Sequence, residues 1–192
     1  NMSVRLPETG HMLLTSVGQL THLTPEQLVV VTFDGEIVEG SLDPIAREIV
    51  GMHACVYRMR KEVNAVIHTH SPRTTSFALA HQALPCAYEA FLRFGITEDI
   101  PVADWAPRGS QEAVSYIVEQ LERHPTVPAV LLANHGLLAF SSDALATVQL
   151  IVIMEEAAQL TLDARTLGGE NLFPADAIEK ERKHMQQFGS AR

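Results

Sequence analysis

The sequence has little cysteine, few aromatic residues and a shortage of positive charge. Its 192 residues include two cysteines and 6% aromatic residues, and 14 Lys and Arg stand against 23 Asp and Glu, which gives a formal net charge of −9. A negative chain with a pI near 5.4 disfavours nucleic acid and anionic membranes as partners. Cys55 and Cys86 are too few for a disulfide framework, so we interpret both as buried free thiols of a cytoplasmic protein.

Several other signatures are missing. We find no apolar run of membrane-spanning length, no signal peptide, no Walker-type phosphate loop, no dinucleotide fingerprint and no Ser-His-Asp spacing. The composition, 46% hydrophobic and 19% charged, suffices for a single compact domain over residues 1–192. Because a strand pattern begins directly at Asn1, we expect that an upstream N-terminal segment precedes it.

The first part of the chain has the pattern of antiparallel strands. The expected strands form two pairs: 2–6 with 11–15, and 29–33 with 36–38. The dipeptide Asp34-Gly35 between the last two is a strong hairpin signal. Thr24 and Pro25 suit the cap and first position of a short helix between the pairs.

After these strands, helical and strand-like segments alternate. Apolar residues recur at helical spacing in four segments: 43–60, 72–80, 110–123 and 144–167. Further strands are expected at 65–70, at 83–87, and at 129–135 with 137–140 continuing beyond Gly136. A polar, charged tail follows Gly168 and Gly169, which end the last helix. The pattern predicts an α/β domain with a mostly antiparallel sheet and helices packed over it.

Two of the apolar strands end in histidine. Segment 65–70 ends with His68 and His70, and segment 129–136 ends with His135 and a glycine. Residues i and i+2 of a strand point to the same face, so His68 and His70 project together, roughly 6 to 7 Å apart along the strand. A third imidazole from His135 would leave one position open, which suits a catalytic zinc. The alternative is that three unrelated histidines happen to follow strands.

Carboxylates and a hydroxyl-rich loop complete the candidate chemistry. Glu48 lies on the helix before the histidine strand, among apolar neighbours that suit a proton shuttle near neutrality. Glu89 is a second candidate acid or base, although each carboxylate also suits an ordinary solvated position. The loop 15–18 presents hydroxyls and a flexible glycine to an anion, but most such loops are turns. Asn134 suits either a neighbour of the histidines or a turn residue.

Segments 1–5, 14–18, 62–70 and 134–136 together resemble the class II aldolase/adducin family, whose enzymes include fuculose-phosphate aldolase and ribulose-phosphate epimerase. The resemblance covers nearly the whole chain and implies a three-layer α/β/α domain around a central sheet. It also implies a homotetramer with active sites at subunit interfaces.

The resemblance assigns a role to each matching position. It implies that His68, His70 and His135 bind a divalent metal, zinc or another ion such as Mn²⁺ or Co²⁺, and that Glu48 is the catalytic acid or base. It further implies that the substrate phosphate is bound by Asn1, Thr15, Ser16 and Gly18.

Two departures from the family pattern bear on the substrate. Where aldolases of this family have Pro-Ser-Ser-Glu, segment 42–48 is longer and has no serine, and counting back from His53 reaches Ile49 rather than Glu48. Either Arg47 replaces the serines as an anion contact, or the substrate carries a carboxylate instead of a phosphate. The position where an aldolase often has Tyr falls at Glu89.

We therefore expect a metal-dependent carbon–carbon lyase that cleaves a small sugar, sugar phosphate or hydroxy-keto acid through a metal-stabilised enediolate. Decarboxylation or epimerisation by the same site is the nearest alternative. A non-catalytic, adducin-like binding module is a further one.

Overall fold

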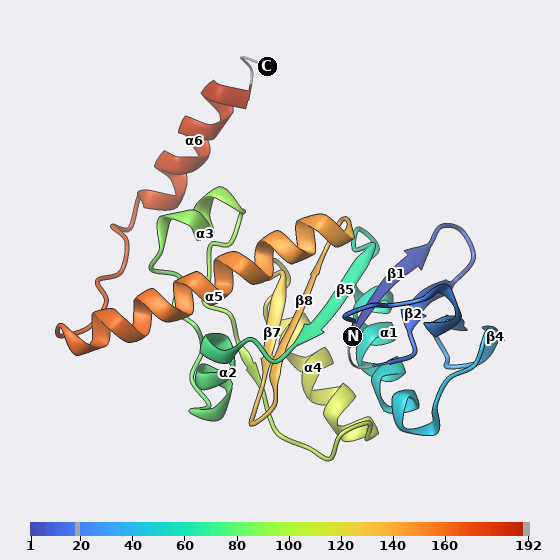
Figure 1. Ribbon diagram of the computed structural model, residues 1–192. Helices are drawn as coiled ribbons and strands as arrows, with labels where there is room; N and C mark the ends of the chain where they lie inside the picture. Colours follow the sequence, from blue (N-terminus) through green and yellow to red (C-terminus); the bar gives the residue numbers. More distant parts are fainter. Residues whose placement is uncertain (18–19, 190–192) are drawn as a thin grey trace.

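The computed structural model describes residues 1–17 and 20–189, in which one sheet is covered by helices on both faces (Figure 1). The strands are β1 (Met2–Leu6), β2 (His11–Thr15), β3 (Leu28–Thr32), β4 (Ile37–Glu39), β5 (Ala65–Thr69), β6 (Val102–Ala103), β7 (Ala129–Leu132) and β8 (Gly136–Ser141). The 3₁₀ helices are η1 (Pro25–Gln27) and η2 (Pro44–Arg47). The α-helices are α1 (Glu48–Met59), α2 (Pro72–Leu79), α3 (Glu89–Arg93), α4 (Gln111–Arg123), α5 (Ala144–Thr166) and α6 (Ala177–Gly189).

The strand directions gather several loops at one edge of the sheet. The described strands follow the order β4-β3-β2-β1-β5-β8-β7-β6. Neighbours pair antiparallel, except that β6 and β7 are parallel. Strands β2, β5, β6 and β7 therefore run in the same direction and end at the same edge, where β1 begins. The topology places the side chains that follow these four strands along one edge of the sheet, and those after β5 and β7, which are separated only by β8, lie near each other.

Strand side chains alternate between two helical layers, as the pleat requires. Val66, Val130 and Leu138 pack with α1 and α4, whereas Leu131 and Leu137 pack with α2, α3 and α5 on the opposite face. The result is the expected three-layer α/β/α arrangement around a mostly antiparallel sheet. His68 has the same parity along β5 as Val66, so it faces the layer of α1 and α4.

Three predicted helices form within one residue of their expected bounds, as α2, α4 and α5, and side-chain caps explain where α4 and α5 begin. The helix expected over 43–60 begins later, at Glu48 and without a side-chain cap, because residues 44–47 form the 3₁₀ helix η2. Ser110 accepts a hydrogen bond from the backbone N–H of Ala113, at 3.1 Å. Asp143 accepts one from Ala146, at 2.8 Å. These side chains satisfy amide groups that have no partner inside the helix.

Three segments differ from the sequence-based prediction. Segment 83–87 is not a strand, since Leu84 makes only an isolated bridge to Ile100 among the described residues and Pro85 has no N–H to donate. Segment 129–140 is a hairpin rather than one continuing strand, because the chain reverses at Asn134, whose φ is +58°. The polar tail forms α6, which stands away from the sheet (Figure 1).

Helix α5 corrects the expectation that no apolar run reaches membrane-spanning length. By length and composition it does, with a mean hydropathy of 1.4 over its most apolar window. One side of it packs on the sheet through residues that include Leu150, Met154 and Ala158. The other side carries exposed apolar residues, among them Leu145, Val148 and Val152.

Candidate metal and substrate site

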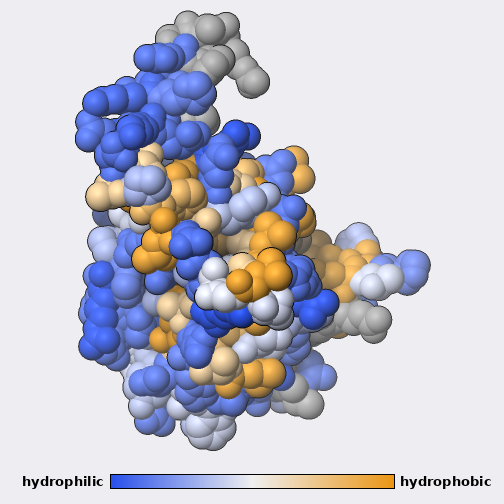
Figure 2. Space-filling view, turned by 90° about the vertical axis from the view of Figure 1, so that its left-hand side faces the viewer, coloured by the Kyte–Doolittle hydropathy of each residue, from blue (hydrophilic) through white to orange (hydrophobic). Residues whose placement is uncertain are grey.

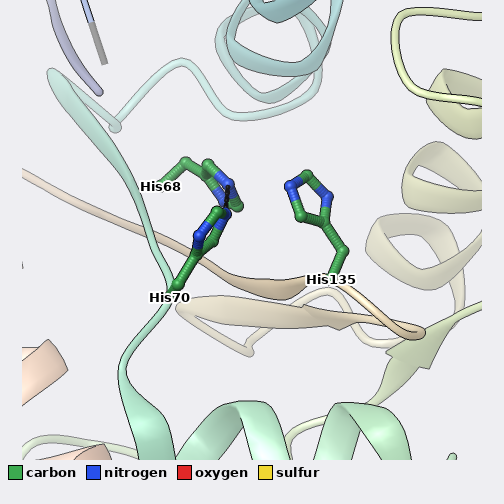
Figure 3. Close-up of side chains that lie close together, drawn as sticks. All are labelled: His68, His70 and His135. Carbon is green, nitrogen blue, oxygen red and sulfur yellow. Dashed lines mark hydrogen bonds between the residues drawn. The ribbon is translucent and has the colours of Figure 1, made fainter. Parts of the chain in front are cut away.

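The three predicted histidines meet at the edge of the sheet (Figure 3). His68 lies near the end of β5, His70 follows that strand, and His135 occupies the turn between β7 and β8. Their ring centroids are 4.6 to 5.0 Å apart. One nitrogen of each ring lies within 4.8 Å of the others. The structure therefore brings together the group that the sequence predicted.

The ring of His68 has a defined orientation. Its Nδ1 lies 3.0 Å from the backbone oxygen of Leu137. A carbonyl oxygen accepts only, so Nδ1 carries the proton and Nε2 of the neutral ring keeps its lone pair. That Nε2 lies 3.1 Å from Nε2 of His70. A backbone carbonyl that holds the far nitrogen of an imidazole is a common support for metal-binding histidine.

The surroundings of the histidines favour the neutral rings that bind metals. Burial lowers the pKa of His68 to about 2, with smaller contributions from the charged forms of His135 and His70. Burial also lowers the pKa of His135, and the charges of His70 and Arg108 act in the same direction. Both rings are therefore neutral at pH 7, as metal ligation requires.

Gly136 explains why a glycine follows the third histidine. A Cβ at this position would lie 2.6 Å from the backbone oxygen of Thr69 and 3.0 Å from Cδ2 of His70. Any larger residue would push β8 away from the end of β5. The glycine thus permits the close approach of the two histidine-bearing segments.

A cavity of about 660 Å³ opens beside the histidines. Its polar lining includes Asn1, Glu48, Asp104 and Arg108. Between α1 and α4 the lining is apolar and comprises Ile49, Met52, Ala113, Val114 and Ile117. The cavity therefore joins a group of nitrogen donors, charged side chains and an apolar wall.

Glu48, the candidate acid or base, lines this cavity, and so does its neighbour Ile49. The Oε2 atom of Glu48 lies 2.9 Å from Nε of Arg108. Gly109, with φ +77°, packs so closely that a Cβ there would lie 2.7 Å from Cβ of Glu48. The loop after β6 is thus fitted against the first turn of α1.

Asn1 also lines the cavity, through contacts that reach into the core. Its Oδ1 accepts a hydrogen bond from Nε2 of His53, at 2.6 Å, and its backbone nitrogen donates to the oxygen of His68, at 3.1 Å. His53 lies on the helix of Glu48, as expected, and is fully buried. Its Nδ1 lies 2.7 Å from Oγ of Ser3, and burial lowers its pKa to about 3.

Other sequence-predicted site residues lie away from the cavity wall. Glu89 begins α3, outside the cavity lining, and pairs with Arg93 at 2.7 Å. Arg47 ends η2 with an exposed side chain. Thr15 is buried and accepts from the amide of Met2, because it ends a central strand.

Ser16 of the predicted anion loop is not part of the cavity lining either. Ser16 donates to the backbone oxygen of Gln27, at 3.0 Å. Gly18 lies outside the described residues.

Sequence reasoning missed the loop 104–110, which brings Asp104, Trp105 and Arg108 to the cavity. Nothing in the spacing marks these residues as functional. The one indication in the sequence was the expected helix start at Ser110, because a loop must precede that helix. Asn134 is mainly a turn residue, since its φ is positive and its Oδ1 lies 2.6 Å from Nε2 of His81.

The sequence profile described as "Class II Aldolase and Adducin N-terminal domain" matches residues 1–162. The chain belongs to the class II aldolase and adducin family. A 5-deoxy-D-ribulose 1-phosphate aldolase of Bacillus thuringiensis serovar kurstaki is 29% identical, over 98% of this chain and 86% of the relative. An L-ribulose-5-phosphate 4-epimerase of Salmonella paratyphi A is 30% identical, over 85% of this chain and 74% of the relative. A solved L-fuculose 1-phosphate aldolase superposes with a TM-score of 0.84 at 26% identity, over 96% of this chain and 84% of that one.

The family comprises enzymes of the aldolase and epimerase type, and class II aldolases use a divalent metal. The residues of this chain fit such an ion. His68, His70 and His135 offer adjacent nitrogen donors, the first ring has a fixed tautomer, and Gly136 leaves room for the group.

Proposed function

We propose that this protein is a metal-dependent aldolase that cleaves a carbon–carbon bond in a small sugar, sugar phosphate or hydroxy-keto acid. The observation that carries the proposal is the three-histidine group in a cavity that Glu48 also lines. The metal is zinc or a similar ion such as Mn²⁺ or Co²⁺, since three imidazoles with an open position suit these ions.

His68, His70 and His135 would hold the ion. When bound, it supplies a Lewis acid that stabilises the negative charge that develops on substrate oxygens during bond cleavage. The protein's own contribution begins with the hydrogen bond from His68 to Leu137, which keeps one donor nitrogen aimed at its neighbours.

Glu48 is the proposed acid and base. Its carboxylate takes the proton from the substrate hydroxyl that becomes a carbonyl, and it later returns a proton to the carbon left by the departing fragment. Its place on the cavity wall supports this role, whereas Glu89 lies outside that wall. The proposal therefore assigns both proton transfers to Glu48. Asn1, on the same wall, is a proposed contact to the substrate.

The apolar wall favours a substrate with a deoxygenated end. Ile49, Met52, Val114 and Ile117 offer no hydrogen-bond partner to a hydroxyl, so burying one there would be unfavourable. A 5-deoxy sugar phosphate, as in the name of the Bacillus relative, is the first substrate to test. Fuculose 1-phosphate and ribulose 5-phosphate, chosen from the names of the other relatives, are the comparison substrates.

Product analysis separates the candidate reactions. Two carbonyl fragments would support the aldolase, carbon dioxide would indicate a decarboxylase, and an inverted hydroxyl with an intact carbon chain would indicate an epimerase. The similarity to the L-ribulose-5-phosphate 4-epimerase makes epimerisation the second candidate.

Metal content tests the foundation of the proposal. Elemental analysis of the wild type should find about one divalent ion per chain, since three ligands form one site. The double variant His68→Ala/His70→Ala should lose it. A wild type without metal, even after reconstitution, would contradict the aldolase and favour a non-catalytic, adducin-like module.

We further propose a cytoplasmic homotetramer with active sites at subunit interfaces. Exposed apolar side chains on α5 support subunit contacts, with Val152 at 61% and Leu145 at 68% exposure. Figure 2 shows hydrophobic residues exposed among hydrophilic ones on one side of the molecule. Light scattering should give a tetramer, and Val152→Glu should weaken it. A wild-type monomer would contradict this assembly.

A further inference from the structure

The charge on the cavity wall is unevenly distributed. Glu48 and Asp104 contribute carboxylates, and Arg108 is the one Lys or Arg that lines the cavity within the described residues. Arg108 lines the same cavity as His68, His70 and His135. Arg108 is therefore a cation placed beside the site where the substrate is expected to bind.

The ion pair between Arg108 and Glu48 leaves most of the guanidinium available. The pair joins Nε of Arg108 to Oε2 of Glu48 at 2.9 Å. A guanidinium has five N–H donors, and the pair uses the one on Nε. The two terminal amino groups are the donors that match the oxygens of a carboxylate or phosphate in a bidentate contact.

The pair is also exposed enough to exchange partners. The side chain of Arg108 is 54% exposed and that of Glu48 is 41% exposed. Ion pairs in contact with water contribute little to stability, so an incoming anion competes for the guanidinium without a large penalty. The backbone under Arg108 is firmly placed, since Gly109 packs against Glu48 and Ser110 caps α4.

We propose that Arg108 selects an anionic substrate by binding its carboxylate or phosphate, and that this anion displaces Glu48, which frees the Glu48 carboxylate for proton transfer. The inference rests on the proposed function, because it takes the cavity to be the substrate site. It replaces Arg47, which the sequence suggested as the anion contact and which lies outside the cavity lining.

Anion binding tests the first half of the proposal without measuring turnover. Calorimetric titration of the metal-loaded protein with inorganic phosphate, and separately with glycolate, gives the affinity for each anion class. Arg108→Gln should lower the affinity for the preferred anion about tenfold or more, as expected for loss of a bidentate contact. Arg123→Gln, on α4 and paired with Glu119, is the matched control and should bind like the wild type.

Three results would overturn this half: a wild type that binds neither anion, an Arg108→Gln variant that binds both as the wild type does, or an equal loss in Arg123→Gln. Metal content and circular dichroism on the same samples check that each variant folds. Arg108→Lys is the second variant. It keeps the positive charge but loses the paired amino groups of the guanidinium, so it should bind the anion with intermediate affinity.

Glu48→Gln tests the displacement. Removing the competing carboxylate should increase the affinity for the anion several-fold. If the ion pair only held the loop in place, both Glu48→Gln and Arg108→Gln would lower the affinity for the anion. Unchanged or reduced affinity in Glu48→Gln overturns the displacement. Failure of the proposed aldolase would show differently, as absent metal or absent cleavage products in the wild type.

Discussion

Nδ1 of His68 donates a hydrogen bond to the backbone oxygen of Leu137, at 3.0 Å. The two residues lie on neighbouring antiparallel strands, β5 and β8, in adjacent registers of the ladder. The sheet itself therefore orients a candidate metal ligand, through the main chain of the strand that begins directly after His135. Changes that move β8 relative to β5 should disturb the metal site before they unfold the protein.

Gly136→Ala tests this dependence. Its Cβ would lie 2.6 Å from the oxygen of Thr69, so β8 must shift and carry Leu137 with it. We expect metal affinity to fall about 10- to 100-fold, as when the support of a ligand is removed. Competition with a chelator measures the loss. Gly168→Ala is the control, because it also places an alanine on a left-handed backbone but its Cβ would have no atom within 4 Å. Its metal affinity should stay at the wild-type value. An equal loss of metal affinity in the two variants would contradict the steric explanation.

Metal binding should stabilise the fold measurably. Nε2 of His68 and Nε2 of His70 lie 3.1 Å apart and would share the ion. An ion that binds only the folded chain adds about 4 kcal/mol to the free energy of unfolding at a thousand times its Kd. Thermal melts with chelator and with added zinc give the shift in Tm. The shift should vanish in His135→Ala, and its survival there would exclude His135 as a ligand.

Glu48→Gln should abolish most turnover while the metal remains. Loss of a general acid or base typically lowers kcat about 10²- to 10⁴-fold. Steady-state kinetics on the cleaved substrate, with metal content in parallel, measure both effects. Glu119→Gln changes an exposed ion pair on α4 and serves as the control. Glu89→Gln should have a far smaller effect than Glu48→Gln, since Glu89 pairs with Arg93 outside the cavity lining.

His53 should make the fold sensitive to acid. Its Nε2 donates to Asn1, so its Nδ1 accepts from Ser3, and a second proton would break that bond. Burial lowers its pKa to about 3 in the folded state from 6.5, so between these values the unfolded chain binds the extra proton. Stability is therefore present above pH 6.5 and falls as the pH drops below it.

The size of this effect is measurable by urea denaturation. Between pH 7.5 and 5.5, the free energy of unfolding should drop roughly 1 to 1.5 kcal/mol more in the wild type than in His53→Gln. The comparison between the two proteins removes the contribution of the other histidines. Parallel pH profiles would contradict the role of His53.

Much of the fold could be predicted because local chemistry fixes it. Helical spacing and capping residues located α4 and α5, and Asp34-Gly35 located the β3–β4 turn. Spacing also indicated the helix that contains α1, but not its start at Glu48. The histidine group was also predictable. His68 and His70 share a strand face, and each apolar segment ends where a buried strand must return to the surface.

The remaining features depend on contacts between segments distant in sequence. Arg108 reaches Glu48 because β6 pairs parallel with β7, and no local pattern specifies that pairing. Thr15 and Ser16 have the residue types of an anion loop, but neighbouring backbone groups occupy their hydroxyls. Residue type identifies a possible ligand, whereas strand order decides which candidates meet.

The position of β1 has a practical consequence for preparing the protein. In the described part of the chain, β1 alone connects β2–β4 to β5–β8, so a truncation that removes residues 1–6 would divide the sheet instead of trimming its border. Asn1, at the start of β1, lies beside the backbone of His68 and lines the cavity, so the same truncation would also remove part of the cavity wall. A label attached to α6, which stands away from the sheet (Figure 1), would leave this connection between the strands intact.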